Sequence, residues 1–346
     1  MVMQLINITA LKRLIFIGIC GLLVGCEPNG IEVDIEKQWA LENDGIMRNM
    51  AIDQKNCSIP RSHIKKDIDI DALEMWELLE DMSLEKTIVA IIDSGVNYEN
   101  EELGRHRWDN PREVKENNID DDGNGYIDDE CGVDFVRERG ILSNEEYTHS
   151  EHGTACAGII CADTRNGVAD VANNCPVEIM SLRVFDPTAK ESENDVNDII
   201  SAIHYAEENG ARICNMSFGM GMYSEGLRKC MEESEMLFIC SAGNSNGTFQ
   251  KNIDKERYYP ASFDLANMIT VANVGFDGRL YYTSNYGPDS VDVVAPGVNI
   301  YVMSGNEEYS YQTGTSFAVS YVSGIAALLL SVDSGLRSNE LKQSGK

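Results

Sequence analysis

The apolar residues of the chain gather in short runs that predict strands, and between these runs they follow the three-to-four-residue spacing of helices. Aliphatic runs predict buried strands at 88–92, 178–184, 212–216, 237–241, 268–274 and 291–294. Helical spacing predicts helices at 70–79, 152–161, 195–208 and 225–233, and a largely apolar helix after Ser316. Because strands and helices alternate from residue 87 onward, we expect an α/β fold of three layers, with a mostly parallel central sheet and helices on both faces.

The first residues have a different character. Lys12 and Arg13 precede an apolar run, 14–24, that is too short to span a bilayer as a helix. The run ends in Leu23-Val24-Gly25-Cys26, which resembles the lipobox of bacterial lipoproteins. The resemblance implies a signal peptide at 1–25, lipidation of Cys26, a tether at 26–37 and a place on the outer face of the bacterial membrane. A plain signal peptide or an uncleaved anchor is the alternative.

Length and charge narrow the class of protein. The 346 residues suit one large domain with small additions, and we expect a monomer. The chain has 57 acidic and 28 basic residues, a net charge of −29. This charge argues against nucleic acid or an anionic membrane surface as a partner, and it leaves carboxylates available to bind calcium.

Ten cysteines occur, and none has a spacing typical of a zinc site. Cys20 lies in the signal segment. Four others lie within apolar helix or strand patterns, which predicts buried free thiols: Cys156, Cys161, Cys214 and Cys240. Four more have polar surroundings, so disulfide pairing among them stays open: Cys57, Cys131, Cys175 and Cys230.

Three polar residues stand where chemistry can be placed. Asp93 follows the predicted strand 88–92, and His152 begins a predicted helix. Ser316 lies in the first turn of the apolar helix, where unpaired N–H groups and the positive end of the helix dipole meet. Each residue alone has a structural explanation, as a turn carboxylate, a hydrogen-bonded histidine or a helix cap. Together they form the order Asp, His, Ser, which is one of the known chain orders of a nucleophilic triad.

The sequence around these three residues resembles the subtilases, the subtilisin-like serine proteases. Three strings carry the triad residues: Asp93-Ser94-Gly95, His152-Gly153-Thr154 and Gly314-Thr315-Ser316. Three further strings resemble the substrate-binding strand, the strand with the oxyanion asparagine and the approach to the serine: Asn215 to Gly219, Ser241 to Asn244 and Asp292 to Gly297. Six motifs in the family's order cover the chain from about Gln38 to its end.

The resemblance implies a subtilisin-like fold, a catalytic domain at 87–346 and a segment, 38–86, that packs on it. It implies a serine endopeptidase that acts on proteins or peptides and needs no cofactor for its chemistry. Asp93, His152 and Ser316 would be catalytic, and the Asn244 amide with the Ser316 N–H would bind the oxyanion. Substrate-binding residues would be Ser217, Phe218, Gly219, Ser241, Ala242 and Gly243.

The chain also departs from the family pattern. Ser320 replaces a usual proline, Asp170 replaces a common glycine, and only 331–346 follow the apolar helix, with Asn339 to Gln343 resembling the start of another. Residues 27–37 are too few to form a pro-domain, so we expect no autoinhibitory domain. Two alternatives stay open: a narrow-specificity protease that processes a leader or precursor, and an inactive or truncated peptide-binding protein of the same fold.

One acidic loop follows the pattern of calcium-binding loops. In the stretch 118–129, oxygen-bearing side chains alternate, a glycine follows, and a carboxylate ends the loop. The predicted ligands of a structural Ca²⁺ are Asn118, Asp120, Asp122 and Asp129. A solvated acidic turn is the alternative reading. A second calcium site is considered in the loop 163–168, where Arg165 weakens the prediction.

Overall fold

The computed structural model describes residues 35–142, 150–162, 169–186, 196–245, 250–304 and 308–344. The predictions for the signal peptide, for Cys26 and for the loop 163–168 fall outside these residues, as does most of the tether.

A central sheet organises the molecule. Among the described residues it has eight strands in the order β3-β2-β4-β1-β5-β6-β7-β8. The strands are β1 Thr87–Asp93, β2 Gly132–Asp134, β3 Arg139–Gly140, β4 Val177–Arg183, β5 Ile213–Met216, β6 Leu237–Ser241, β7 Met268–Val274 and β8 Val293–Pro296. Neighbours pair in parallel except β2 with β3, so the predicted α/β fold with a mostly parallel sheet is confirmed.

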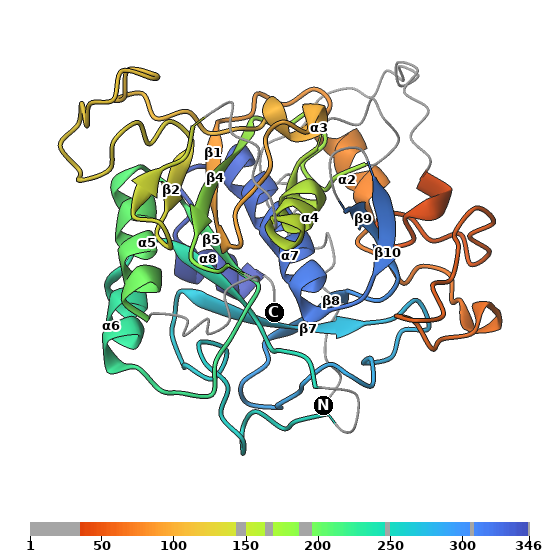
Figure 1. The fold of residues 1–346 in the computed structure, drawn as a ribbon. Helices are drawn as coiled ribbons and strands as arrows, with labels where there is room; N and C mark the ends of the chain where they lie inside the picture. Colours follow the sequence, from red (N-terminus) through yellow and green to blue (C-terminus); the bar gives the residue numbers. More distant parts are fainter. Residues whose placement is uncertain are drawn as a thin grey trace.

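Strand β1 shows why the apolar runs are continuous rather than alternating. Val89 and Ile91 belong to one buried cluster, and Ala90 and Ile92 belong to another. The first cluster includes residues of α4 (Glu151–Ile160) and α7 (Thr315–Val332), and the second includes residues of α5 (Val196–Glu208) and α6 (Glu225–Glu233). Both faces of the sheet are therefore covered by helices, as Figure 1 shows, and its strands are buried on both sides.

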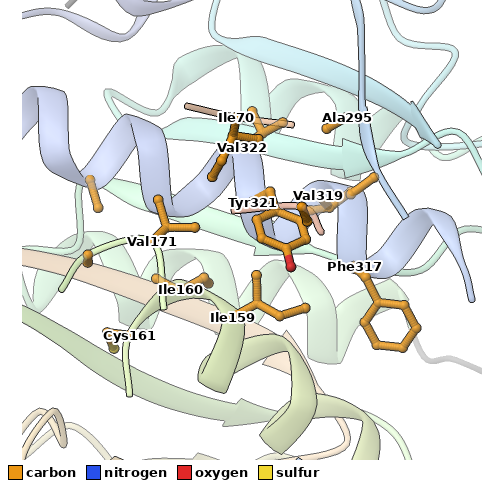
Figure 2. Packing of buried hydrophobic residues seen from close by; sticks show 14 of the residues in the cluster. Ile70, Ile159, Ile160, Cys161, Val171, Ala295, Phe317, Val319, Tyr321 and Val322 are labelled. Carbon is orange, nitrogen blue, oxygen red and sulfur yellow. The ribbon is translucent and has the colours of Figure 1, made fainter. Parts of the chain in front are cut away.

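Helix α7 is the central helix of the molecule. Phe317, Val319 and Val322 pack in the same buried cluster as Ile159 and Ile160 of α4 (Figure 2). By length and composition α7 is apolar enough to cross a membrane, but 89% of it is buried inside the protein. Its hydrophobicity is thus that of a core helix. Because α7 is packed in the core, the position of Ser316 in its first turn is fixed.

The elements that the pattern missed are short or lie at edges. Strands β2 and β3 have too few residues to show a period. The hairpin of β9 (Ile300–Met303) and β10 (Tyr309–Gln312) forms a separate antiparallel pair. The one-turn helix α3 (Glu101–Gly104) and the short 3₁₀ helices η1 (Ile35–Lys37) and η2 (Arg61–His63) carry too few turns for a pattern. The expected start of a helix near Asn339 is α8 (Ser338–Ser344).

The segment before β1 lies against the rest of the protein. Helix α2 (Ala72–Leu79) and the loops before it are drawn in red and orange in Figure 1. The Trp39 side chain is completely buried, donates a hydrogen bond from Nε1 to the Val298 carbonyl at 2.9 Å, and meets Phe276 edge to face at 5.8 Å. The Gln38 side chain donates to the Ala169 carbonyl at 2.7 Å. The boundary at residue 86 between this segment and a catalytic domain stays a prediction.

The cysteines are unpaired throughout the described residues. All eight are free and buried, including the four for which pairing was open: Cys57, Cys131, Cys175 and Cys230. Polar residues beside Cys57, Cys175 and Cys230 are exposed while the thiols are buried, whereas Cys131 lies in a stretch where its polar neighbour Glu130 is buried as well.

Candidate active site

Three adjacent strands end at the proposed site. Asp93 is the last residue of β1, Ser217 directly follows β5, and Ser241 is the last residue of β6. Since β1, β5 and β6 are neighbours in the sheet and run in parallel, their carboxyl ends meet at one edge. This is the edge at which open α/β sheets bind ligands.

Asp93 and His152 form the best-defined pair at this edge. The His152 Nδ1 lies 2.8 Å from Asp93 Oδ1 and 2.9 Å from Oδ2. The carboxylate is buried and also accepts the Ser94 N–H at 2.7 Å, whereas 43% of the His152 side chain is exposed. Asp93 therefore fixes one ring nitrogen as a donor and leaves the other, Nε2, for a reacting group.

The position of His152 depends on close contact between α4 and the loop after β1. A Cβ on Gly153 would lie 2.2 Å from the Gly95 carbonyl oxygen, so only glycine allows this approach. The Gly153 N–H donates to Ser94 Oγ at 3.3 Å, and Thr154 Oγ1 accepts the Asn97 N–H at 3.0 Å. The loop after Asp93 and the first turn of α4 are thus joined residue by residue.

Ser316 lies in the first turn of α7 and is nearly buried. Its hydroxyl donates to the Ser217 carbonyl at 3.0 Å, and the Ser217 hydroxyl donates in turn to the Ser316 carbonyl at 3.2 Å. The His152 ring lies 6.3 Å from the ring of Phe317, the residue after the serine. The structure therefore brings the histidine beside the start of α7, with the Ser316 hydroxyl in a resting hydrogen bond to Ser217.

Asn244 is joined to the start of the same helix. Its Oδ1 accepts the Thr315 N–H at 3.1 Å, and the Thr315 hydroxyl lies 2.7 Å from Ser241 Oγ. The Asn244 residue is exposed, and its Nδ2 donates to no other group in the described part of the chain. The amide is thus oriented with its N–H groups available beside Ser316, as binding of an oxyanion requires.

Burial and charge set the protonation of the site. Asp93 raises the pKa of His152 above its usual 6.5 through its negative charge and its hydrogen bond, against the opposing effect of burial. Cys156 lies one helical turn after His152, and burial raises the pKa of its thiol to about 12. A thiol at neutral pH is a poor nucleophile. The Cys156 thiol therefore stays protonated at neutral pH, and the Ser316 hydroxyl remains the predicted nucleophile.

Sequence reasoning missed the polar network beneath Ser316. The Ser316 carbonyl accepts a hydrogen bond from Ser320 Oγ at 3.1 Å as well as the one from Ser217. Asn215 donates to Ser217 Oγ at 3.0 Å and accepts from Ser323 Oγ at 2.9 Å. The only signal in the sequence was the family proline replaced by Ser320. This replacement supplies a hydroxyl that tethers the backbone of the nucleophile.

The segment expected to bind substrate is also held in place. Met220 and Tyr259 exchange two backbone hydrogen bonds, of 2.7 and 2.8 Å. Phe218 packs edge to face on Phe185, with ring centroids 4.7 Å apart. Ser217, Phe218 and Gly219 therefore form a supported stretch beside the segment Ser241 to Asn244.

The acidic loop approaches a further carboxylate, that of Glu113, which the spacing of the loop did not reveal. Carboxylate oxygens of Glu113, Asp120 and Asp122 all lie within 4.8 Å of one another. Asp129 is completely buried, and within the described residues its Oδ1, like Glu113 Oε2, has no hydrogen-bond partner. Burial raises the pKa of both Glu113 and Asp129, each carboxylate near Asp122. Unpartnered buried carboxylate oxygens fit a bound cation.

Asn118, the remaining predicted ligand of this loop, helps to shape the loop through its backbone. The Asn118 N–H donates to Asp128 Oδ2 at 2.9 Å, and the residue takes a left-handed φ of 59°. Asp120 accepts the N–H groups of Gly123 and Gly125, at 2.7 and 2.9 Å, so it shapes the turn that carries the other carboxylates.

Comparison with known proteins gives one consistent family. A family profile described as "Subtilase family" matches residues 85–344. The "Thermophilic serine proteinase" of Bacillus sp. (strain AK1) is 31% identical over 276 residues, which are 78% of this chain and 57% of that protein. The "Subtilisin-like protease 1" of Plasmodium berghei (strain Anka) is 29% identical over 75% of this chain and 45% of that protein.

Structural comparison agrees on the fold. The crystal structure of a cold adapted subtilisin-like serine proteinase superposes with a TM-score of 0.55 and 24% sequence identity, and the match covers 88% of this chain and 90% of the other. The chain spans about half the length of the curated relatives that it matches.

Proposed function

Because this chain belongs to the subtilase family, we propose that it is a serine endopeptidase that hydrolyses proteins or peptides through Asp93, His152 and Ser316. The observation that carries the proposal is the pair of contacts between His152 Nδ1 and Asp93 at 2.8 and 2.9 Å, at the carboxyl edge of the sheet and beside the start of α7. No cofactor is needed for this chemistry.

The reaction begins with transfer of a proton from Ser316 Oγ to His152 Nε2. This transfer requires the Ser316 hydroxyl to leave the Ser217 carbonyl, which it contacts at rest. As Oγ attacks the peptide carbonyl, negative charge develops on the carbonyl oxygen, where the Asn244 Nδ2 and the Ser316 N–H stabilise it. The imidazolium, stabilised by Asp93, then gives its proton to the leaving amine, and water repeats the cycle on the acyl-enzyme.

The substrate would bind as an extended strand. The stretch Ser217 to Gly219 follows the end of β5, beside the neighbouring strand β6. Its backbone groups can pair with an extended peptide.

Substitution of the nucleophile tests the proposal. Ser316→Ala removes Oγ while Ser320 still tethers the backbone, so kcat should fall about 10⁶-fold, a magnitude measured in subtilisin. Equal peptide hydrolysis by wild type and Ser316→Ala would overturn the assignment.

The same protein would bind one structural Ca²⁺ at Glu113, Asp120 and Asp122, with the buried Asp129 carboxylate near this group. The buried oxygens of Glu113 and Asp129 that lack hydrogen bonds support this, since a cation would give both a partner. The ion would neutralise carboxylates whose pKa values burial now raises. It would link the loop to α5 through Asp129, which accepts a hydrogen bond from Tyr205 at 2.5 Å.

Thermal unfolding with and without a chelator tests the calcium site. Calcium that binds only the folded state raises the unfolding midpoint with its concentration. The double variant Glu113→Gln with Asp129→Asn should lose this dependence. Asp109→Asn is a matched control, because Asp109 is an exposed carboxylate paired with Arg107 at 2.8 Å. A midpoint of the wild type that does not respond to calcium would contradict the site.

Attachment to the membrane through Cys26 completes the proposal. It is supported by the basic residues, apolar run and Leu23-Val24-Gly25-Cys26 string at the start of the chain. Cells that make the protein should hold it in the membrane fraction with a labelled fatty acid attached. The Cys26→Ser variant should lose the label and leave the membrane or stall before processing. Unchanged membrane retention of Cys26→Ser would assign anchoring to the apolar run itself.

A further inference from the structure

We propose that Tyr258 sets the cleavage preference of the enzyme by filling the space that the side chain before the scissile bond would enter. The preferred residue at that position is then Gly, Ala or Ser. This inference rests on the proposed peptidase function and concerns the choice of substrate at the same site.

The ring of Tyr258 lies between two backbone segments that begin at the site. An ideal Cβ on Gly219 would lie 2.3 Å from Tyr258 Cε1, and one on Gly243 would lie 2.5 Å from the same atom. Real Cβ atoms do not approach so closely, so both positions must be glycine for the ring to lie there. One edge of a single aromatic ring thus occupies the gap between the two segments.

The two glycines stand next to the reacting groups. Gly243 directly precedes Asn244, which binds the Thr315 N–H, and Gly219 is two residues after Ser217, whose carbonyl accepts the Ser316 hydroxyl. A substrate carbonyl attacked by Ser316 must place its oxygen at Asn244 Nδ2. Its own residue then lies over the gap between the segments, and its side chain points into the space that Tyr258 occupies.

Hydrogen bonds hold the backbone on either side of the Tyr258 ring, and packing holds the ring itself. Its backbone N–H donates to Ser262 Oγ at 3.0 Å, and its carbonyl accepts the Ser262 N–H at 2.8 Å. The next residue, Tyr259, is fixed by two backbone hydrogen bonds to Met220. The ring packs on a buried cluster that includes Ala242 and Ala261, and burial raises the pKa of its hydroxyl.

The consequence for substrates is steric. The side chains of Gly, Ala and Ser are a hydrogen, a methyl group and a hydroxymethyl group. Each is small enough to fit between the substrate backbone and the Tyr258 ring. Leucine, methionine or phenylalanine would require the ring to leave its packed position against the buried cluster. Shortening Tyr258 would remove this obstacle without touching Asp93, His152, Ser316 or Asn244.

The test uses peptides that differ only in the residue before the scissile bond. Wild-type kcat/KM should be at least about 100-fold higher for Ala than for Phe, the size of effect that side-chain volume produces in substrate pockets. Tyr258→Gly and Tyr258→Ala should raise the Phe-to-Ala ratio of kcat/KM by a similar factor. Tyr258→Phe, which keeps the ring, should retain the wild-type preference and serves as the matched control.

The outcomes separate this inference from the proposed function. Cleavage of Ala and Phe peptides at comparable kcat/KM by the wild type would overturn the role of Tyr258 while the peptidase function stands. The wild-type profile needs no variant, so a poorly folded Tyr258→Gly leaves the test intact. Absence of cleavage of every peptide, together with no labelling of Ser316 by a fluorophosphonate, would overturn both.

Discussion

A single carboxylate, that of Asp93, governs the protonation of His152. Asp93 is buried at the end of β1, yet its two oxygens lie within 2.9 Å of His152 Nδ1. The nearby negative charge favours the imidazolium, so the pKa of His152 lies above 6.5. The histidine must be neutral to accept the Ser316 proton. Activity therefore falls as the pH drops through this raised pKa.

Asp93→Asn tests this electrostatic role. The acid limb of kcat/KM against pH should lie above pH 6.5 in the wild type and shift to lower pH in the variant, because the negative charge is gone. The kcat should fall about 10⁴-fold, as in the same change in a serine protease triad. The same ion pair, between protonated His152 and Asp93, also stabilises the folded protein. This contribution to stability is fully present below the pKa that His152 has in the unfolded chain, and it is lost as the pH rises through the raised pKa of His152 in the folded protein. An acid limb that does not move in Asp93→Asn would contradict the assignment.

Some residues of the site were visible in the sequence and others were not. Asp93, His152, Ser316 and Asn244 lie within motif strings at strand ends or helix starts, so their positions follow from local pattern. Glu113 comes before the acidic loop and approaches Asp120 and Asp122 only through the folding of that loop. Tyr258 to Ala261 could be expected from the sequence to line the substrate pocket, but only the folded loop shows that the Tyr258 ring lies between Gly219 and Gly243.

At the scale of elements, the contact of α4 with the loop after β1 places the histidine. Strands and helices with long apolar runs were predicted within a few residues, because burial on one or both faces dictates their composition. The β9–β10 hairpin was missed because Tyr309–Gln312 is only partly buried and carries polar residues. Four residues are too few for the alternation of tyrosine with polar residues in β10, or for the apolar run of β9, to predict a strand.

Two glycine substitutions in α4 separate the placing of His152 from general packing. Alanine favours a helix over glycine by about 1 kcal/mol. In Gly153→Ala, however, the new Cβ meets the rigid Gly95 carbonyl at 2.2 Å, so we expect a loss of about 1–3 kcal/mol from overpacking. Displacement of His152 should lower kcat by about 10²-fold.

Gly158→Ala on the same helix is the control. Its Cβ would meet the flexible Met303 side chain, with Sδ at 2.9 Å, which can move aside. Its kcat should stay near the wild-type value, and its thermal midpoint should change less than that of Gly153→Ala. Equal kcat values for the two variants would show that the contact of Gly153 with Gly95 does not position the histidine.

On the scale of the whole molecule, the segment before β1 is part of the folded protein. Trp39 belongs to the buried cluster that also contains Phe317 and Ile159, and it donates to the Val298 carbonyl just after β8. Asn299 links the same region to this segment, because its side chain accepts the Asp53 N–H and donates to the Ala51 carbonyl.

Trp39→Ala should therefore destabilise the protein by about 3–5 kcal/mol, the cost of emptying a large buried site. Ile46→Ala is the control in the same segment, since 52% of Ile46 is exposed. It should change the free energy of unfolding by no more than about 0.5 kcal/mol. Denaturant unfolding measures both values. Equal stability of the two variants would mean that the segment contributes little to the fold.

The central claim is that Ser316 is a nucleophile activated by His152. Reaction of the purified protein with a fluorophosphonate probe, followed by mass spectrometry of its peptides, tests this most directly. We expect one covalent adduct, on Ser316, that is absent in Ser316→Ala and forms far more slowly in His152→Ala. Failure of the folded wild type to react, or an adduct that persists in Ser316→Ala, would contradict it.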